Sequence, residues 1–149
     1  SDRTYSVAKG FYHPDINIFS VNDSTKFALK DVIKNKIAII NWWSPSCGPC
    51  IMEMPELNHL EEEFNNNSEI IFLALNNNPH HNKVIKFLEN NTFNFKQYFV
   101  RGETAKELNI NGIPRTLVID KKGKIVYDQL GYDPSIKLKK LREVIKSLL

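Results

Sequence analysis

The two cysteines of this chain lie close together, in the segment Cys47-Gly48-Pro49-Cys50. Two thiols at this spacing can bind a metal, form a structural disulfide, or exchange electrons as a dithiol and disulfide pair. The segment ends an apolar run typical of a buried strand and opens a stretch with helical periodicity. A helix that begins there directs unpaired backbone N–H groups and its positive dipole end at the first sulfur, which favours the thiolate. We therefore expect Cys47 to be the exposed nucleophile.

Cys50 and Glu53 follow at intervals of one helical turn. Cys50 should lie deeper and within reach of a mixed disulfide between Cys47 and a substrate, so it is the predicted resolving thiol. Glu53 shares a helix face with Cys50. If buried, its carboxyl has a raised pKa and can exchange a proton with that thiol, whereas an exposed Glu53 is an ordinary helix acid. The residues alone leave both interpretations open.

A second feature is the segment Asn111 to Thr116, in which Gly-Ile-Pro introduces an apolar run. Pro114 is compatible with an ordinary trans residue at the start of a strand. It is also compatible with a cis-proline that keeps a backbone N–H away from the cysteines and presents the Ile113 backbone to an extended substrate. Sequence patterns do not decide between the two.

Length and composition fit one globular domain. A chain of 149 residues buries enough surface for a full core without covalent staples, and we expect residues 1–15 to form an N-terminal extension. The net charge of +3 comes with basic residues on a C-terminal helix face, which does not predict nucleic-acid binding. There is no apolar run long enough to span a membrane and no signal-peptide pattern, so we expect any export signal or anchor to lie outside this sequence.

Strand and helix patterns alternate along the chain. A β-hairpin is predicted over Ile16–Leu29, and buried or short strands over 36–43, 69–75, 95–100, 115–120 and 125–130. Helices are predicted over 31–34, 48–65, 80–91 and 102–110, with a kink at Pro55. The chain ends in an amphipathic helix whose predicted buried stripe is Ile136, Leu138, Leu141, Val144, Ile145 and Leu148. The order predicts an α/β fold, in which helices cover both faces of a mixed sheet.

From about Ile16 to Leu148 the chain resembles the thioredoxin superfamily, in particular the TlpA/ResA-like extracytoplasmic thiol-disulfide oxidoreductases. The resemblance rests on the Cys-Gly-Pro-Cys segment, on Pro55 five residues later, and on Gly-Ile-Pro before a final hairpin and helix. Further common features are the N-terminal hairpin, Asn41 and Trp43 on the preceding strand, Glu53, and a helix-strand insertion over 80–100. The implied architecture is a thioredoxin fold with that hairpin and insertion.

The resemblance also implies roles for individual residues. It makes Pro114 a cis-proline and favours Glu53 as the proton partner, because in the ResA-like branch an acid at this position is associated with the active site. The buried Asp that cytoplasmic thioredoxins place at the position of Asn41 is missing here. The implied catalytic residues are Cys47, Cys50, Glu53 and Pro114. The implied substrate-binding residues are Trp43, Ser46, Pro49, Ile113 and Arg115.

Two residues depart from the family pattern. Ser46 stands where a tryptophan usually precedes the first cysteine, which removes apolar surface beside the nucleophile. Arg115 replaces the more usual threonine after the proline. Its cation could favour the Cys47 thiolate or select acidic partners, or it could point into solvent.

The function implied by the resemblance is dithiol-disulfide exchange with protein substrates outside the cytoplasm. We expect a monomeric reductant that serves cytochrome c maturation or other exported thiols and so maintains redox homeostasis. An upstream membrane or soluble thiol-disulfide donor would re-reduce it. No metal or organic cofactor is expected, because the Cys47–Cys50 bond stores the two electrons.

Three alternatives were weighed. A zinc site lacks a second cysteine pair, and His59, His80 and His81 have no zinc-finger spacing. A peroxiredoxin would use Ser44, three residues before Cys47, but its usual proline is Ile40 here. A thioredoxin-fold binding module or holdase with an incidental disulfide is the non-enzymatic alternative, which an insulin-reduction assay distinguishes from an oxidoreductase.

Overall fold

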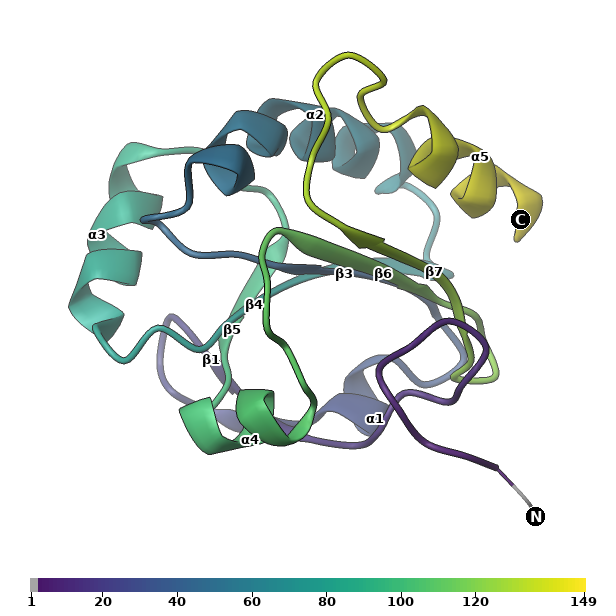
Figure 1. Cartoon of the computed structure of the whole chain (residues 1–149), viewed down its shortest axis with the longest axis horizontal. Helices are drawn as coiled ribbons and strands as arrows, with labels where there is room; N and C mark the ends of the chain where they lie inside the picture. The colour runs from purple at the N-terminus through teal and green to yellow at the C-terminus, as the bar shows by residue number, and fades with distance from the viewer. Residues whose placement is uncertain (1–2) are drawn as a thin grey trace.

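The computed structural model describes residues 3–149 of the chain. Within this range the chain forms seven strands and five helices (Figure 1). The strands are β1 (Asn17–Ser20), β2 (Lys26–Ala28), β3 (Ile37–Trp42), β4 (Ile70–Asn76), β5 (Lys96–Phe99), β6 (Arg115–Ile119) and β7 (Ile125–Leu130). The helices are α1 (Leu29–Val32), α2 (Gly48–Phe64), α3 (His81–Asn90), α4 (Gly102–Glu107) and α5 (Lys139–Ser147).

The strands form one mixed sheet in the order β2-β1-β5-β4-β3-β6-β7. Strand β3 pairs in parallel with β4 and antiparallel with β6. All six residues of β3 are buried, as expected for an inner strand with both faces covered. This position fixes where the chain leaves the sheet toward the cysteines. The predicted α/β fold with a mixed sheet is confirmed.

The helices divide between the two faces of the sheet (Figure 1). Because successive strand residues point to opposite faces, β3 contributes Ile37 and Ile39 to one core and Ala38 and Ile40 to the other. The first core also contains apolar residues of α2, α3 and α5, and the second contains those of α1, α4 and the N-terminal segment. Helix α2, which begins at the cysteines, therefore packs on the first face.

The end of the chain departs from the predicted apolar stripe. Helix α5 begins only at Lys139, and Ile136 is 59% exposed. Asp133 holds the preceding turn, because its carbonyl accepts from the Ile136 N–H and its carboxylate from the Ser135 N–H. The inclusion of Ile136 in the buried stripe was therefore wrong, although Leu141 and Ile145 are buried.

The N-terminal segment is folded against the sheet over its described part, residues 3–15. Tyr12 forms isolated β-bridges with Tyr5 and with Lys124, and Val7 is only 8% exposed. Residues 1–2 of the expected extension lie outside the described residues.

Candidate active site

Cys47 and Cys50 form a disulfide at the start of α2, after a short loop that follows β3. Cys47 is the N-cap residue, and its Sγ accepts a hydrogen bond of 3.2 Å from the Cys50 N–H. Such a donor, together with the helix dipole, stabilises negative charge on Sγ. Cys47 is half-buried, whereas Cys50 is 1% exposed. The two sulfurs therefore differ in access as the sequence predicted.

The loop between β3 and α2 presents Ser46 and Pro49 to solvent. The Cys47 N–H donates to the Ser44 carbonyl at 3.1 Å, and the hydroxyls of Ser44 and Ser46 are 3.0 Å apart. These bonds hold a tight turn before the nucleophile. Contact of Ser46 and Pro49 with a substrate remains a prediction.

Glu53 is buried one turn beyond Cys50, with 2% of its surface exposed. Its Oε1 accepts a hydrogen bond of 3.0 Å from Asn41 Nδ2, and the same amide nitrogen donates to Thr116 Oγ1 at 3.0 Å. Burial raises the pKa of Glu53 from 4.5 to about 7, and the Asn41 hydrogen bond partly opposes the rise. A carboxyl with this pKa can both give and take a proton near neutral pH.

The register of the sheet brings Asn41, Thr116 and Glu53 together. Asn41 on β3 is directly opposite Thr116 on β6, and both face α2, where Glu53 lies. Thr116 was not predicted as a site residue. Its signal in the sequence is weak, because only the long-range pairing of β3 with β6 shows that Thr116 meets Asn41.

A cavity of about 230 Å³ reaches Glu53 from the side of β7 and the segment before α5. Thr116, Tyr127, Gln129 and Tyr132 also contribute to its wall. Burial raises the pKa of Tyr127, and the charge of Glu53 raises it further. The lining residues beside Glu53 are polar, and a cavity of this volume is large enough for several waters.

The Ile113–Pro114 peptide bond is cis, as the family resemblance implied. Arg115 pairs with Trp42 at the last position of β3, so the two preceding residues lie at the same end of the sheet as Cys47. Pro114 is buried and Ile113 is 37% exposed. Their contact with a substrate stays a prediction.

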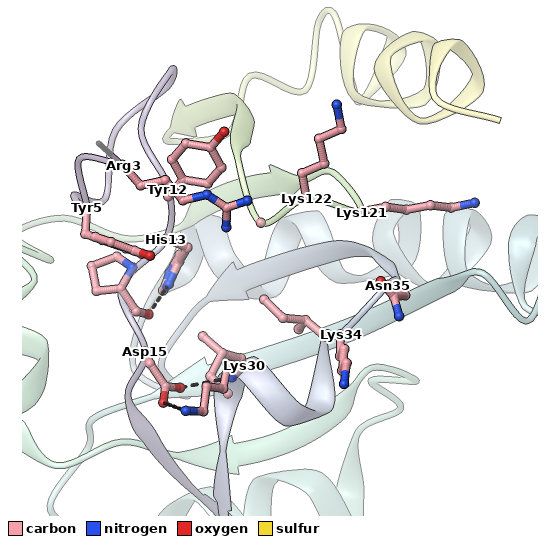
Figure 2. Close-up of a pocket in the computed structure, with 14 residues that line it drawn as sticks. Arg3, Tyr5, Tyr12, His13, Asp15, Lys30, Lys34, Asn35, Lys121 and Lys122 are labelled. Atoms are coloured by element: carbon pink, nitrogen blue, oxygen red, sulfur yellow. Dashed lines mark hydrogen bonds and ion pairs between the residues drawn. The ribbon is translucent and has the colours of Figure 1, made fainter. Parts of the chain in front are cut away.

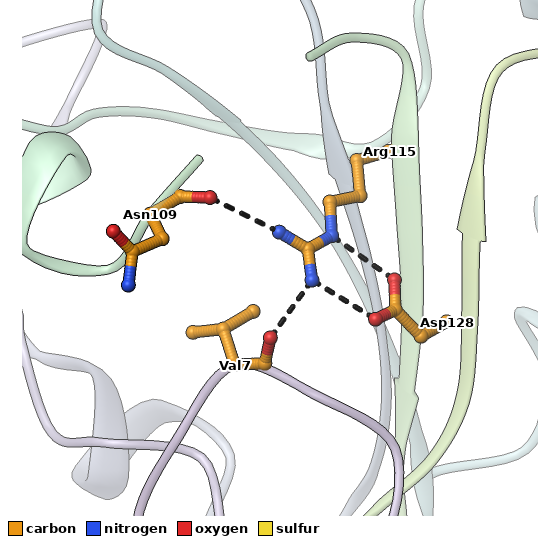
Figure 3. A network of polar contacts seen from close by, with 4 residues as sticks. All are labelled: Val7, Asn109, Arg115 and Asp128. Atoms are coloured by element: carbon orange, nitrogen blue, oxygen red, sulfur yellow. Dashed lines mark hydrogen bonds and ion pairs between the residues drawn. The ribbon is translucent and has the colours of Figure 1, made fainter. Parts of the chain in front are cut away.

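The contacts of Arg115 do not favour its expected substrate-binding role. Its guanidinium donates two hydrogen bonds to the Asp128 carboxylate, at 3.0 and 2.9 Å, and a third to the Val7 carbonyl at 2.8 Å (Figure 3). The side chain is 14% exposed. It projects from β6 on the side opposite Thr116 and α2, because neighbouring strand residues face opposite ways. Arg115 therefore neither approaches the cysteines nor points into solvent.

Trp43 is buried, with 1% of its surface exposed. Its ring packs at centroid distances of 5.5 Å against Phe87 and against Phe93. Its Nε1–H donates to Gln97 Oε1 at 3.2 Å. Trp43 thus connects the start of the cysteine loop to α3 and β5, and this burial does not favour the predicted contact with substrate.

Among residues 3–149, no three His, Cys, Asp or Glu side chains converge to hold a metal ion. None of the helices described there is long and apolar enough to cross a bilayer.

Comparison with known proteins places this site in a family. The model of the redoxin family matches residues 8–145, and the chain therefore belongs to that family. The thiol:disulfide interchange protein DsbE of Pseudomonas aeruginosa is 28% identical over 120 residues, which cover 79% of this chain and 64% of that protein. The thiol-disulfide oxidoreductase ResA of Bacillus thuringiensis subsp. konkukian is 28% identical over 110 residues, with coverages of 73% and 62%. The chain thus spans less than two thirds of either relative.

Solved structures agree with the fold. The thioredoxin domain of a thiol-disulfide oxidoreductase from Bacteroides vulgatus superposes with a TM-score of 0.80, at 22% identity, over 97% of this chain and 100% of that chain. The predicted thioredoxin fold is confirmed. The relatives carry names of the predicted class, a thiol:disulfide interchange protein and a thiol-disulfide oxidoreductase.

Proposed function

We propose that the protein reduces disulfides of protein substrates through Cys47 and Cys50. The Cys47 thiolate attacks one sulfur of the substrate disulfide, forms a mixed disulfide and releases the other sulfur as a thiolate. The Cys50 thiolate then attacks Cys47 Sγ and releases the second substrate thiolate. Two electrons pass to the substrate, its two thiolates are protonated, and the Cys47–Cys50 disulfide remains.

The observation that carries this proposal is the asymmetry of the two sulfurs. Cys47 is the N-cap of α2, and its Sγ accepts a hydrogen bond from the Cys50 N–H. This hydrogen bond stabilises the Cys47 thiolate, which a substrate can reach. Cys50 is 1% exposed, so a protein substrate meets Cys47 first. Attack by the first sulfur and release by the second follow from this arrangement.

Glu53 serves as the proton partner of Cys50 in this proposal. Resolution requires Cys50 to lose its proton at the moment of attack. A neighbouring carboxyl with a pKa of about 7 accepts that proton near neutral pH and passes it to the water-accessible cavity of about 230 Å³.

The substrate surface surrounds the cysteine loop. Ser46 and Pro49 are exposed, and Ile113 is 37% exposed at the same end of the sheet. Ile51 and Met52, in the first turn of α2, are 38% and 57% exposed. We assign to these apolar side chains the docking of an extended substrate segment, in place of the missing tryptophan at position 46.

The direction and place of the reaction rest on likeness. Gly-Pro between the cysteines and Ile113 before the proline resemble reducing members of the superfamily. We propose a monomeric reductant outside the cytoplasm, re-reduced by an upstream thiol-disulfide donor, which acts on apocytochrome c or other exported thiols. Labelling intact cells with a thiol reagent that does not cross the inner membrane tests the location, because Cys47 of an extracytoplasmic protein reacts without lysis.

Two measurements on the purified protein test the activity. Reduced protein should accelerate insulin reduction by dithiothreitol, and Cys47→Ser should abolish the acceleration, while Ser68→Ala at an exposed position leaves it unchanged. The equilibrium potential against glutathione should lie toward the reducing end of the known range, near −270 mV rather than −120 mV. No acceleration would favour a binding module, and a potential near −120 mV would make the protein an oxidant.

A further inference from the structure

A second cavity lies at the other end of β3 from the cysteines. It measures about 610 Å³ and is enclosed by the N-terminal segment, α1 with the residues after it, and the turn between β6 and β7 (Figure 2). Asn35 on its wall precedes β3, whereas Cys47 follows that strand. Six strand residues extend about 20 Å, so the cavity is separate from the candidate active site. Its volume is in the range of small-molecule sites.

The wall of this cavity carries an excess of positive charge. Five of its side chains are basic and one is acidic: Arg3, Lys30, Lys34, Lys121, Lys122 and Asp15. Asp15 is already engaged by Lys30, through the backbone N–H at 3.0 Å and Nζ at 3.9 Å. Lys121 pairs with Glu69 outside the cavity. Lys34 and Lys122 are exposed and have no ion-pair partner among residues 3–149, so the cavity attracts an anion.

The remaining wall is aromatic and apolar. The rings of Tyr5 and Tyr12 are tilted against each other with centroids 6.3 Å apart. Figure 2 shows the Arg3 guanidinium beside Tyr12, with its Cζ 4.5 Å from the ring centroid. Leu29 and Ile33 supply apolar surface. A bound anion therefore finds surface for a flat or apolar body next to the cations.

We propose that this cavity binds a phosphate ester whose body packs against Tyr5 and Tyr12 and toward whose phosphate Lys34 and Lys122 turn, since these two exposed side chains point to opposite sides of the empty cavity in Figure 2. Each ammonium has three N–H donors and no acceptor, which suits a phosphate with several oxygens. The phosphate can belong to a soluble ester or to the headgroup of a phospholipid, because the cavity recognises the same chemistry in both. The proposal does not depend on the function assigned to the cysteines.

The test is an NMR titration of the full chain with phenyl phosphate, inorganic phosphate and phenol. Phenyl phosphate should bind most tightly and shift amide signals in residues 3–15, 30–35 and 121–123. Lys34→Gln with Lys122→Gln should weaken phenyl phosphate roughly tenfold, the combined effect of two exposed charges. Lys26→Gln with Lys106→Gln removes the same charge from exposed positions elsewhere and should leave the affinity unchanged.

Tyr5→Ser tests the aromatic contact, since Tyr5 is 58% exposed and its replacement should not disturb folding. It should weaken phenyl phosphate and leave inorganic phosphate unaffected. A third arm compares vesicles of phosphatidylglycerol with vesicles of phosphatidylcholine. Binding to phosphatidylglycerol vesicles alone, if it depends on Lys34 and Lys122, identifies a phospholipid as the source of the phosphate. Binding of phenyl phosphate without binding to vesicles identifies a soluble phosphate ester. Absence of both, or equal loss in the Lys26 and Lys106 control, overturns the proposal.

Discussion

The Glu53 carboxyl is under two opposing influences. Burial raises its pKa from 4.5 to about 7, while the Asn41 N–H, which favours the ionised form, holds the pKa down. The resulting pKa of about 7 lies in the pH range in which thiol exchange takes place. The charge of Glu53 then opposes ionisation of the neighbouring Cys50 above neutral pH.

Replacing Glu53 should alter the titration of the thiols. In Glu53→Gln the charge that opposes thiolate formation is absent, so the apparent pKa for alkylation of the reduced protein should fall by on the order of one unit. The inflection near pH 7 should also disappear. Rates of iodoacetamide reaction from pH 5 to 10 measure both effects. Glu62→Gln, an exposed acid on the same helix, is the control, and identical profiles for all three proteins would make Glu53 a structural residue only.

The same variant should change how stability depends on pH. The folded protein keeps a proton on Glu53 between pH 4.5 and about 7, where the unfolded chain has released it. Folding stability therefore falls as pH rises through this window, by up to roughly 3 kcal/mol. Urea unfolding of the oxidised protein should show this decline in the wild type, and Glu53→Gln should lack it.

Asn41→Ala should raise the pKa of Glu53 above 7, because the hydrogen bond that Asn41 donates to the ionised carboxylate is lost. Carbon-detected NMR of the Glu53 carboxyl measures the shift. Asn58→Ala removes an amide of α2 that bonds to the Thr92 carbonyl instead, and it should leave the pKa unchanged. A lower pKa in Asn41→Ala would contradict the assigned role of the amide.

The sequence predicted local relations between site residues better than distant ones. Cys47, Cys50 and Glu53 share one helix, so their spacing alone implied their arrangement. Thr116 is distant from Asn41 in the chain, and only the register of β3 with β6 joins them. The burial that decides between the two interpretations of Glu53 is likewise a property of the packed fold.

Among the elements, β6 carries different residues on its two faces. Thr116 serves the candidate active site, whereas Arg115 ties β7 and the N-terminal segment together through Asp128 and the Val7 carbonyl. A guanidinium that is 14% exposed would remain largely buried without its counter-ion. This pair should contribute to stability and not to thiol chemistry.

Asp128→Asn should therefore destabilise the protein by about 2–3 kcal/mol, because it leaves the Arg115 charge buried without a partner. Urea unfolding measures the loss. The exposed pair Lys121–Glu69 is the control, and Glu69→Gln should cost less than 1 kcal/mol. Below the unfolding transition, insulin reduction by Asp128→Asn should match the wild type. A loss of activity with unchanged stability would return Arg115 to the active site.

At the scale of the elements, apolar runs and caps predicted most strands and helices, but not every boundary. The run that became β3 is fully buried and was recognisable as such. The start of α5 was not, because Asp133 forms a turn in which its own side chain and backbone accept the following N–H groups. These local hydrogen bonds of Asp133 compete with helix formation, so the helix begins later although the apolar periodicity of the sequence is unchanged.

At the scale of the whole molecule, folding also lowers the pKa of His13. Burial lowers the pKa of His13 below 6.5, against a smaller opposite effect of its hydrogen bond to the Pro14 carbonyl. The unfolded chain binds this proton at a higher pH than the folded protein does. Stability should consequently fall as pH drops below 6.5 toward the folded pKa.

His13→Asn tests this, because it retains a donor for the Pro14 carbonyl but does not titrate. The comparison belongs in a Glu53→Gln background, since Glu53 contributes a slope of opposite sign over part of the same range. Between pH 6.5 and about 5, the stability of the His13 protein should fall more steeply than that of His13→Asn. Parallel slopes in urea unfolding would show that His13 is protonated equally in both states.

Trapping of mixed disulfides in cells tests whether Cys47 attacks the substrate and Cys50 resolves the mixed disulfide. Cys50→Ser and Cys47→Ser variants are expressed in cells, quenched in acid and separated on non-reducing gels. Cys50→Ser should accumulate dithiothreitol-sensitive adducts in which mass spectrometry identifies Cys47 as the linked residue, and Cys47→Ser should accumulate none. Adducts that accumulate on Cys50 in the Cys47→Ser variant, with none on Cys47, would contradict these roles.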